Sequence, residues 1–344
     1  MRQNKRNQWP LDAHIPFSIS GIEEHSMTFS LERYLDIKMH QAVRSGDGRI
    51  LVVGDYDRAC EIADCEKNDK PFNYHRPTAE TLDDGTVVLK CYPGRDYVRH
   101  YAALAETWVR ITNQDREVRY VLPTEQKCWD TLENSNIGEV PVSDVAIIGW
   151  GLHKLTDQPF TQGSPFVWAT DRLDRHSVTY IGCHYSLWSD AGGRFVAWLG
   201  HLGFNRVIYV GKLGSLNPDV RPNEFLATGA ESAVEDEIVR WTNVFADVRR
   251  DNLLHGRHCN CPGVIMETAE WVGRHRDYDF VDSELGQMAK YANSAGIEFS
   301  YLHFVSDNVV KKYDEDLAVE RREAVIAKRE QVLQAWREIL FHMP

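Results

Sequence analysis

Short apolar runs separated by helical patterns are the feature that most constrains how this chain folds. The runs are rich in β-branched and aromatic residues and are bounded by Gly, Pro or Asp, which is typical of buried strands. They lie at residues 50–53, 178–182, 207–211, 224–228 and 297–305. Apolar positions at helical spacing occur at residues 194–202, 285–295 and about 316–341. This alternation predicts an α/β fold in which helices cover a mostly parallel sheet.

The stretch from about residue 66 to 163 interrupts this alternation. It is rich in Asp, Glu, Asn and Pro, and it carries strand candidates of its own at residues 86–90, 119–122 and 145–149. We therefore predict a main α/β domain over residues 50–344, interrupted by an insertion at about residues 66–163 that packs on it. Residues 1–49 are then an N-terminal extension.

Length, composition and charge exclude several classes of protein. A chain of 344 residues can bury a large core, and 43% hydrophobic with 26% charged residues is ordinary for a soluble globular protein. The net charge of −12 argues against binding to a nucleic acid polymer, and we interpret the basic residues Arg2, Lys5 and Arg6 as a solvated tail. We expect no membrane helix and no secretory signal, because no apolar stretch approaches the roughly 20 residues of a span. The expected location is cytoplasmic.

The cysteines predict reduced thiols rather than a disulfide framework, because they are odd in number and scattered. They are Cys60, Cys65, Cys91, Cys128, Cys183, Cys259 and Cys261. His255 and His258 lie beside the last two, which raises the question of a metal site. Zinc sites space paired cysteines by two to four residues and add a second ligand pair, and that second pair does not follow here. We favour a loop with polar side chains and predict no metal.

Two turns that follow strands are candidates for binding an anion. In the first, Gly54 opens a turn whose backbone N–H groups could face a phosphate, and Arg58 adds a charged fork. In the second, Gly211 and Gly214 let the backbone approach a ligand, with Lys212 at the edge. Either turn alone also fits a plain connection. We predict that Gly54, Arg58 and Lys212 bind phosphate in one pocket.

Carboxylates follow two further predicted elements. Asp282, Ser283 and Glu284 open a helix, and Asp307 and Asn308 close the next strand. Ligands of α/β sheets bind at the carboxyl ends of strands, where these residues are expected to lie. The alternative is structural, with Asp282 or Ser283 as a helix cap and Asp307 as a turn residue.

Taken together and in this order, the motifs resemble those of the purine nucleoside and uridine phosphorylase superfamily, which includes bacterial nucleosidases. That family has a Gly-Asp-Pro-x-Arg turn after its first strand, compared with Gly-Asp-Tyr-Asp-Arg at residues 54–58 here. It has a strand that ends Val-Gly-x-x-Gly, matched at residues 210–214, and a Met-Glu-led helix before a strand that ends Val-Ser-Asp, compared with Ser283, Glu284 and residues 305–307. The resemblance covers residues 50–64 and about 178 to the C-terminus.

The resemblance implies a nucleoside phosphorylase-like mixed sheet flanked by helices, and cleavage of an N-glycosidic bond. Glu284 is then the acceptor for the ribose 2′- and 3′-hydroxyls, and Asp307 the acid that protonates the leaving base. Asp282, Ser283, Gly214 and Asn308 are expected to contact the substrate. The expected partner is a small nucleoside or nucleotide, with no cofactor except phosphate as a co-substrate. A non-catalytic nucleoside-binding protein on the same scaffold is the alternative.

The chain also departs from the family pattern, chiefly where the family binds phosphate. Tyr209 stands where an Arg is usual, Lys212 replaces Ser or Thr, Ser283 replaces Met, and Asn308 follows where His is frequent. These changes favour water over phosphate as the attacking group, or a nucleotide that brings its own phosphate. By analogy with the family we expect a homo-oligomer, in which His40 could reach a neighbour's ribose pocket.

Overall fold

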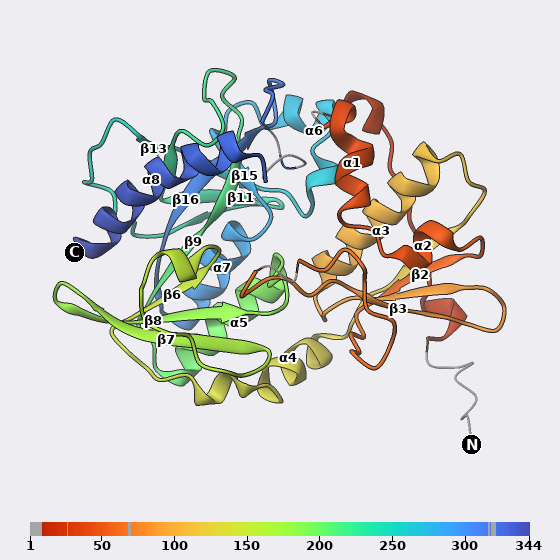
Figure 1. Ribbon diagram of the computed structural model, residues 1–344, viewed down its shortest axis with the longest axis horizontal. Helices are drawn as coiled ribbons and strands as arrows, with labels where there is room; N and C mark the ends of the chain where they lie inside the picture. Colours follow the sequence, from red (N-terminus) through yellow and green to blue (C-terminus); the bar gives the residue numbers. More distant parts are fainter. Residues whose placement is uncertain (1–8, 26, 68–69, 316, 318–320) are drawn as a thin grey trace.

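A computed structural model describes residues 9–25, 27–67, 70–315, 317 and 321–344 of the chain. The strands form two separate sheets, one of five strands near the N-terminus and one of eleven strands in the rest of the chain. Figure 1 shows the two sheets side by side with helices around them. The basic residues Arg2, Lys5 and Arg6 lie outside the described residues.

The large sheet is built around the long strand β9 (Arg206–Ser215). Strands β6 (Val145–Gly149) and β16 (Glu298–Asn308) both run parallel to it. Beyond β6 follow β8 (His176–Cys183) and β7 (Phe166–Leu173). The remaining strands are β10 (Leu226–Thr228), β11 (Glu231–Val234), β12 (Glu237–Arg240), β13 (Leu253–His255), β14 (His258–Asn260) and β15 (Phe280–Asp282). Strands β7, β10, β12 and β15 form antiparallel pairs, so the sheet is mixed and the predicted fold class is confirmed.

Helices cover both faces of the large sheet. They are α5 (Asp190–Leu202), α7 (Leu285–Ala295) and α8 (Glu323–Phe341). Alternate residues of β9 serve the two faces, as strand geometry requires. Val207 and Tyr209 belong to the apolar cluster that contains α5 and α7, whereas Ile208 and Val210 belong to the cluster that contains α8. The central strands are therefore apolar on both sides.

The smaller sheet has the strand order β1 (Ile15–Pro16), β5 (Val118–Val121), β2 (Ile50–Val53), β4 (Val87–Lys90), β3 (Thr78–Thr81). Helix α3 (Arg95–Ile111) packs on β2 and β5. The other helices are α1 (Leu31–Asp36), α2 (Gln41–Ser45), α4 (Glu125–Glu133) and α6 (Ala269–Arg274). Single 3-10 turns occur at Leu11–Ala13, Ile22–Glu24, Thr28–Ser30, Asn136–Glu139, Leu152–Lys154 and Val264–Met266.

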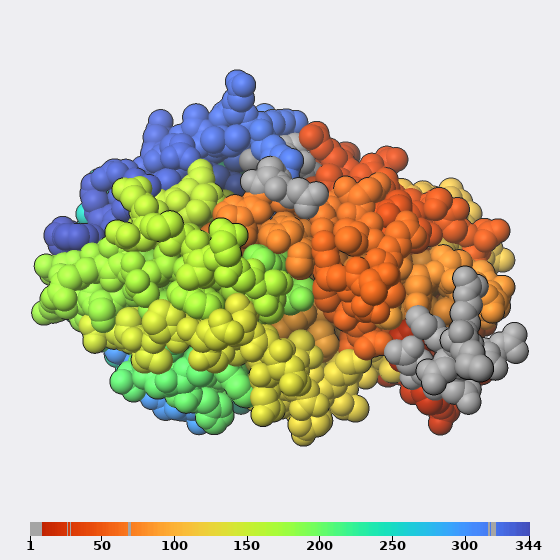
Figure 2. All heavy atoms as spheres, turned by 60° about the horizontal axis from the view of Figure 1, so that its bottom comes forward, coloured from red at the N-terminus to blue at the C-terminus, as the bar shows by residue number. Residues whose placement is uncertain are grey.

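The strand pairing corrects the predicted domain boundaries. Residues 50–53, expected to open the main sheet, pair instead with β4 and β5 in the smaller sheet. Residues 145–149, expected inside an insertion at 66–163, form β6 of the large sheet. The division into an extension over 1–49 and a main domain from 50 to 344 therefore does not follow the sheets. Figure 2 shows the red and orange N-terminal part packed against the rest of the chain.

Several elements differ in length from their predictions. The strand expected at 207–211 continues to Ser215, and the helix expected at 194–202 begins at Asp190. The last helix begins at Glu323, and Asp316, its predicted start, lies outside the described residues. Helices α3 and α4 lie in the stretch that showed only strand candidates. Among the described residues, the helices are too short or too polar to span a membrane.

Candidate functional site

A cavity of about 180 Å³ lies where the N-terminal part meets the large sheet, at the carboxyl ends of β9 and β16. Most of the predicted site residues line it, namely Lys212, Gly214, Asp282, Ser283, Glu284 and Asp307. The two glycine positions of β9 explain how side chains crowd this end of the sheet. A Cβ at Gly211 would lie 2.8 Å from Nε2 of His303, and one at Gly214 would lie 3.2 Å from Oδ2 of Asp307.

Asp307 reaches the cavity through an irregularity in β16. The pairing of β16 with β9 shifts register between Val305 and Asp307, which turns the bulged strand locally. The side chain of Ser306 donates a hydrogen bond of 2.7 Å to Oδ1 of Asp307. Asp307 is only 9% exposed, so its carboxyl is held at the cavity wall and largely shielded from bulk water.

Glu267 is a buried carboxyl of the same cavity that the sequence reading missed. Burial raises the pKa of Glu267 well above its usual value, and the negative charges of Asp307 and Asp282 raise it further. Neighbouring carboxylates resist simultaneous ionisation, so Glu267 keeps its proton more readily than an exposed glutamate. Its position after a short 3-10 turn carries no sequence signal beyond a single acidic residue.

Asp282 is both a cavity residue and a side chain that holds the start of helix α7. Its Oδ1 accepts the backbone N–H groups of Glu284 at 3.0 Å and Leu285 at 2.9 Å. Asp282 therefore has the structural role of accepting backbone donors at the start of α7, where the N-cap residue itself is Glu284, and these bonds hold Glu284 at the cavity. Burial and the nearby charge of Asp282 raise the pKa of Glu284 well above its usual value, although Lys38 and Lys212 act in the opposite direction.

Two buried histidines flank the Asp282 carboxylate. Nε2 of His258 lies 3.2 Å from Oδ1, and Nε2 of His303 lies 3.5 Å from Oδ2. On its other side, Nδ1 of His258 lies 2.8 Å from Oγ of Ser232. Burial opposes ionisation of Asp282, but the two imidazoles outweigh it and lower the pKa of this carboxyl. Asp282 is thus a fixed anion beneath Glu284.

Lys212 lies at the edge of the cavity, where its ammonium is 5.2 Å from the ring centre of Trp150.

Asn308 is not among the described residues that line the cavity. Its amide donates to the backbone oxygens of Asn217 and Val220, at 2.7 and 3.0 Å. The predicted substrate contact of Asn308 is therefore corrected to a role in holding the neighbouring loop.

Gly54 and Arg58 are absent from the described residues that line this cavity, which corrects the shared phosphate pocket predicted for Arg58 and Lys212. Gly54 packs on Pro123, whose Cγ would lie 2.8 Å from an added Cβ. Nη1 of Arg58 lies 2.5 Å from Oε1 of Glu66. Arg58 does not reach the cavity because β2, the strand before it, pairs with β4 and β5 in the smaller sheet. The turn that holds Gly54 and Arg58 therefore does not lie beside β9.

The remaining histidine and cysteine candidates have structural surroundings. Nδ1 of His40 accepts the N–H of Ala42 and so caps helix α2. Cys259 and Cys261 are buried in an apolar cluster, and all seven cysteines are free thiols. Within the described ranges, groups of three or more side chains suited to hold a metal ion are absent.

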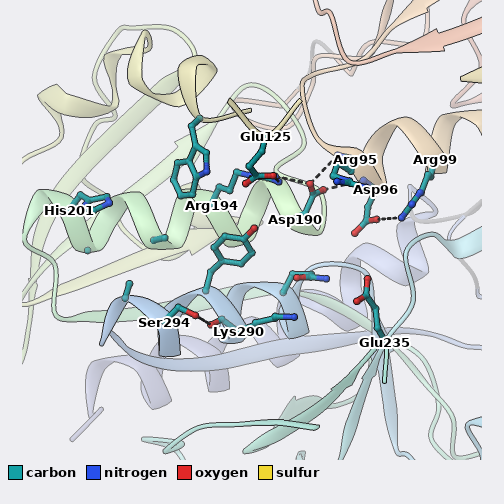
Figure 3. A pocket seen from close by; sticks show the side chains of 16 residues that line it. Arg95, Asp96, Arg99, Glu125, Asp190, Arg194, His201, Glu235, Lys290 and Ser294 are labelled. Atoms are coloured by element: carbon teal, nitrogen blue, oxygen red, sulfur yellow. Dashed lines mark hydrogen bonds and ion pairs between the residues drawn. The ribbon is translucent and has the colours of Figure 1, made fainter. Parts of the chain in front are cut away.

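A larger cavity of about 710 Å³ lies between α3, α4, α5 and α7, as Figure 3 shows. Its charged groups are largely engaged with one another. The guanidinium of Arg194 lies 2.6 Å from Glu125 and 2.7 Å from Asp190. Asp190 also accepts the backbone N–H groups of Arg95 and Asp96 at the start of α3. These contacts join the N-terminal part to the large sheet, and we interpret this region as structural.

Comparisons with known proteins give a mixed result. No protein-family model matches the chain. It is similar to a curated protein, oxidoreductase cns1 of Cordyceps militaris. The match runs over 243 residues with 24% identity and covers 59% of this chain. The match covers 31% of that protein, so this chain spans about a third of the length of the curated relative it matches.

Solved structures similar to this chain are nucleosidases and nucleoside phosphorylases. The 5′-methylthioadenosine/S-adenosyl homocysteine nucleosidase of Campylobacter jejuni is 14% identical, with a TM-score of 0.45 over 59% of this chain and 100% of that chain. A double mutant of the adenosine/methylthioadenosine phosphorylase of Schistosoma mansoni is 15% identical, with a TM-score of 0.43 over 58% of this chain and 90% of that chain. A mutant futalosine hydrolase of Helicobacter pylori is 14% identical, with a TM-score of 0.43 over 58% and 97%.

Proposed function

We propose that this chain cleaves the N-glycosidic bond of a nucleoside or nucleotide, releasing the base by hydrolysis or phosphorolysis. The observation that carries the proposal is the meeting of Glu284 and Asp307 in one cavity. The two residues come from different elements, the start of α7 and the end of β16, and both open onto the same space. A carboxyl acceptor and a carboxyl acid on one cavity wall suit a substrate with a diol and a basic leaving group.

The chemistry assigns a role to each group. Glu284 acts as the carboxylate and accepts hydrogen bonds from the ribose 2′- and 3′-hydroxyls; the charges of Lys38 and Lys212 favour this form against burial and Asp282, which raise its pKa. The bond between C1′ and the base nitrogen breaks, its electron pair stays on the base, and Asp307 supplies the proton that neutralises the base. Water or phosphate then adds to C1′, and when water adds, the proton that it loses returns to the Asp307 carboxylate. Because the sugar becomes positively charged as the bond stretches, the fixed anion Asp282 beneath Glu284 stabilises that state electrostatically.

Glu267 supports the acid role of Asp307 as a store of the proton. A pair of neighbouring carboxyls tends to share one proton between them, because ionising both places two like charges together. The negative charge of Asp307 contributes to the raised pKa of Glu267, so the resting proton lies on Glu267, and Asp307 would take it up to protonate the base. Such a pair can hold a proton at the position where a leaving base needs it.

The test is the substitution Asp307→Asn, which keeps the shape and a hydrogen-bond donor but cannot transfer a proton. Release of free base from a nucleoside and nucleotide panel is followed by chromatography, with and without phosphate. We expect kcat to fall about 10²–10⁴-fold with KM within a few-fold, as for loss of a general acid. Nitrophenyl ribosides, whose leaving group needs little protonation, should lose much less.

The matched control is Glu298→Gln, at the other end of the same strand, where the side chain pairs with Arg206 at the surface. This variant should retain wild-type turnover. Equal losses on natural and activated substrates, or full activity of the Asn variant, would contradict the acid role. Binding of nucleosides without release of base from any of the panel would instead identify a non-catalytic binding protein.

A further inference from the structure

The wall of the site cavity that comes from the N-terminal part of the chain is positively charged. Among the described residues of that wall, every charged side chain is a cation, namely Lys38, Lys67, Lys70 and Arg76. The acidic residues of the cavity come from the large-sheet side. The chain as a whole carries a net charge of −12, so this concentration of positive charge is local to the cavity. A cleft lined by one sign of charge attracts ligands of the opposite sign.

Arg76 is the strongest indication of an anionic ligand, because it is a buried cation. Its side chain is 5% exposed, and its Nη1 donates to the backbone oxygens of His75 at 2.8 Å and Asn73 at 3.3 Å. Its Nε is buried without an acceptor, and ion pairs of its guanidinium are absent among the described residues, although Oε1 of Glu66 accepts the backbone N–H of Arg76 at 3.1 Å. Burying a charge without a counter-charge is costly.

Other arginines of this protein show what Arg76 lacks. Arg58, from the same segment, pairs with Glu66, and the buried Arg194 pairs with two carboxylates. The buried Arg194 therefore has its counter-charges within the fold, whereas the buried Arg116, which does not line the cavity, donates to the backbone oxygens of Gly48 and Val43. At Arg76, which faces the cavity, a bound anion would supply the missing charge.

Lys38 connects this cation to the proposed ribose site. Burial and, to a smaller extent, the charges of Lys38 and Arg76 together lower the pKa of His100 to about 3. The charge of Lys38 also acts on Glu284, at the other side of the cavity. Positive charge therefore extends from the neighbourhood of Arg76 to that of Glu284.

We propose that the substrate of this site is a nucleoside phosphate, whose ribose contacts Glu284 and whose phosphate is bound by Arg76 and Lys38. This inference rests on the proposed function and names its substrate class. A guanidinium presents a rigid fork that matches phosphate oxygens, and an ammonium adds a second point of attraction. A neutral nucleoside would leave Arg76 without a counter-charge. A free phosphate ion has the same chemistry, so the experiment must separate the two sources.

The experiment is calorimetry of the full chain carrying Asp307→Asn, which is expected to slow turnover about 10²–10⁴-fold. The ligands are adenosine, guanosine, cytidine and uridine, their 5′-monophosphates, and inorganic phosphate alone and together with each nucleoside. For the base that binds best, we expect the monophosphate to bind about tenfold or more tightly than its nucleoside. Added salt should reduce this advantage, because it screens the charges.

The variants assign the effect to named side chains. Arg76→Gln should reduce the advantage of the monophosphate to about twofold or less while nucleoside affinity stays unchanged, and Lys38→Gln should reduce it several-fold. Arg58→Gln is the matched control, because this arginine lies in the same segment but outside the cavity lining, and it should keep the full advantage. Circular dichroism checks that each variant is folded. If Arg76→Gln is unfolded, the loss of the monophosphate's advantage in Lys38→Gln is the test of the phosphate site.

Several other outcomes would overturn the inference. Equal affinity for nucleosides and monophosphates would do so, as would an advantage that persists in both Arg76→Gln and Lys38→Gln. If inorganic phosphate with a nucleoside reproduces the gain, the anion is a separate ion and not part of the substrate. Base release distinguishes this inference from the proposed function: cleavage of nucleosides and nucleotides with equal efficiency overturns only the phosphate site. Tight nucleotide binding without base release from the wild-type chain overturns only the cleavage.

Discussion

Glu267→Gln is expected to change how the stability of this protein depends on pH. Burial and the charges of Asp307 and Asp282 raise the pKa of Glu267 well above its usual 4.5. The folded chain therefore holds a proton that the unfolded chain has already released, and stability falls as pH rises from 4.5 toward the raised pKa. Within that window one proton corresponds to about 1.4 kcal/mol per pH unit, or a tenfold change in the unfolding constant.

Glutamine has nearly the same shape as glutamic acid but has no proton to lose, so the variant should lack this slope. We expect it to match the wild type near pH 4.5 and to exceed it progressively as pH rises toward the raised pKa of Glu267, over a series of measurements from pH 5 to 8. The assay is urea unfolding at each pH, followed by tryptophan fluorescence and circular dichroism. Glu298→Gln, which removes a surface carboxyl paired with Arg206, serves as the control. If the free energy of unfolding changes with pH in the same way for Glu267→Gln and the wild type, Glu267 does not have the raised pKa that burial and the neighbouring charges predict.

Two further substitutions test the groups around Glu284. Glu284→Gln should weaken binding of a ribonucleoside about tenfold, because hydrogen bonds to a charged acceptor are lost, and calorimetry with the 2′-deoxynucleoside should show a smaller change. Unaltered affinity would remove Glu284 from the site. His303→Asn should destabilise the fold by about 3 kcal/mol, since it removes one partner of the buried Asp282 carboxylate. A double-mutant cycle with Asp282→Asn measures the coupling, and strictly additive losses in urea unfolding would show that His303 and Asp282 do not interact.

Local sequence patterns determined which segments form the elements of the large sheet. The apolar runs at 178–182, 207–211 and 297–305 lie inside observed strands, and the helix predicted at 285–295 has the bounds of α7. Periodicity and bounding glycines act over a few residues, so they can be read from the chain alone. The same holds for the order of Glu284 and Asp307, whose elements are neighbours in the sequence.

The partners of those elements were decided only by the tertiary structure. An apolar run such as 50–53 predicts a buried strand but not the sheet to which it belongs, because hydrogen bonding between strands is the same in either sheet. Placing that run in the smaller sheet moved Gly54 and Arg58 away from Lys212. Because residues 50–53 were assigned to the wrong sheet, Arg58 was also predicted in the wrong place.

The charged lining of the cavity also depends on long-range packing. The folded chain decides which arginine side chains form ion pairs. The guanidinium of Arg58 pairs with Glu66, whereas Glu66 accepts only the backbone N–H of Arg76. Burial likewise decides that Glu267 keeps its proton and that His258 and His303 meet Asp282. The sequence by itself determined most elements of the large sheet and the carboxylates Asp282, Glu284 and Asp307, but not Glu267. Only the folded chain brought the cations of the N-terminal part to face them, because electrostatic partners are chosen by distance in space.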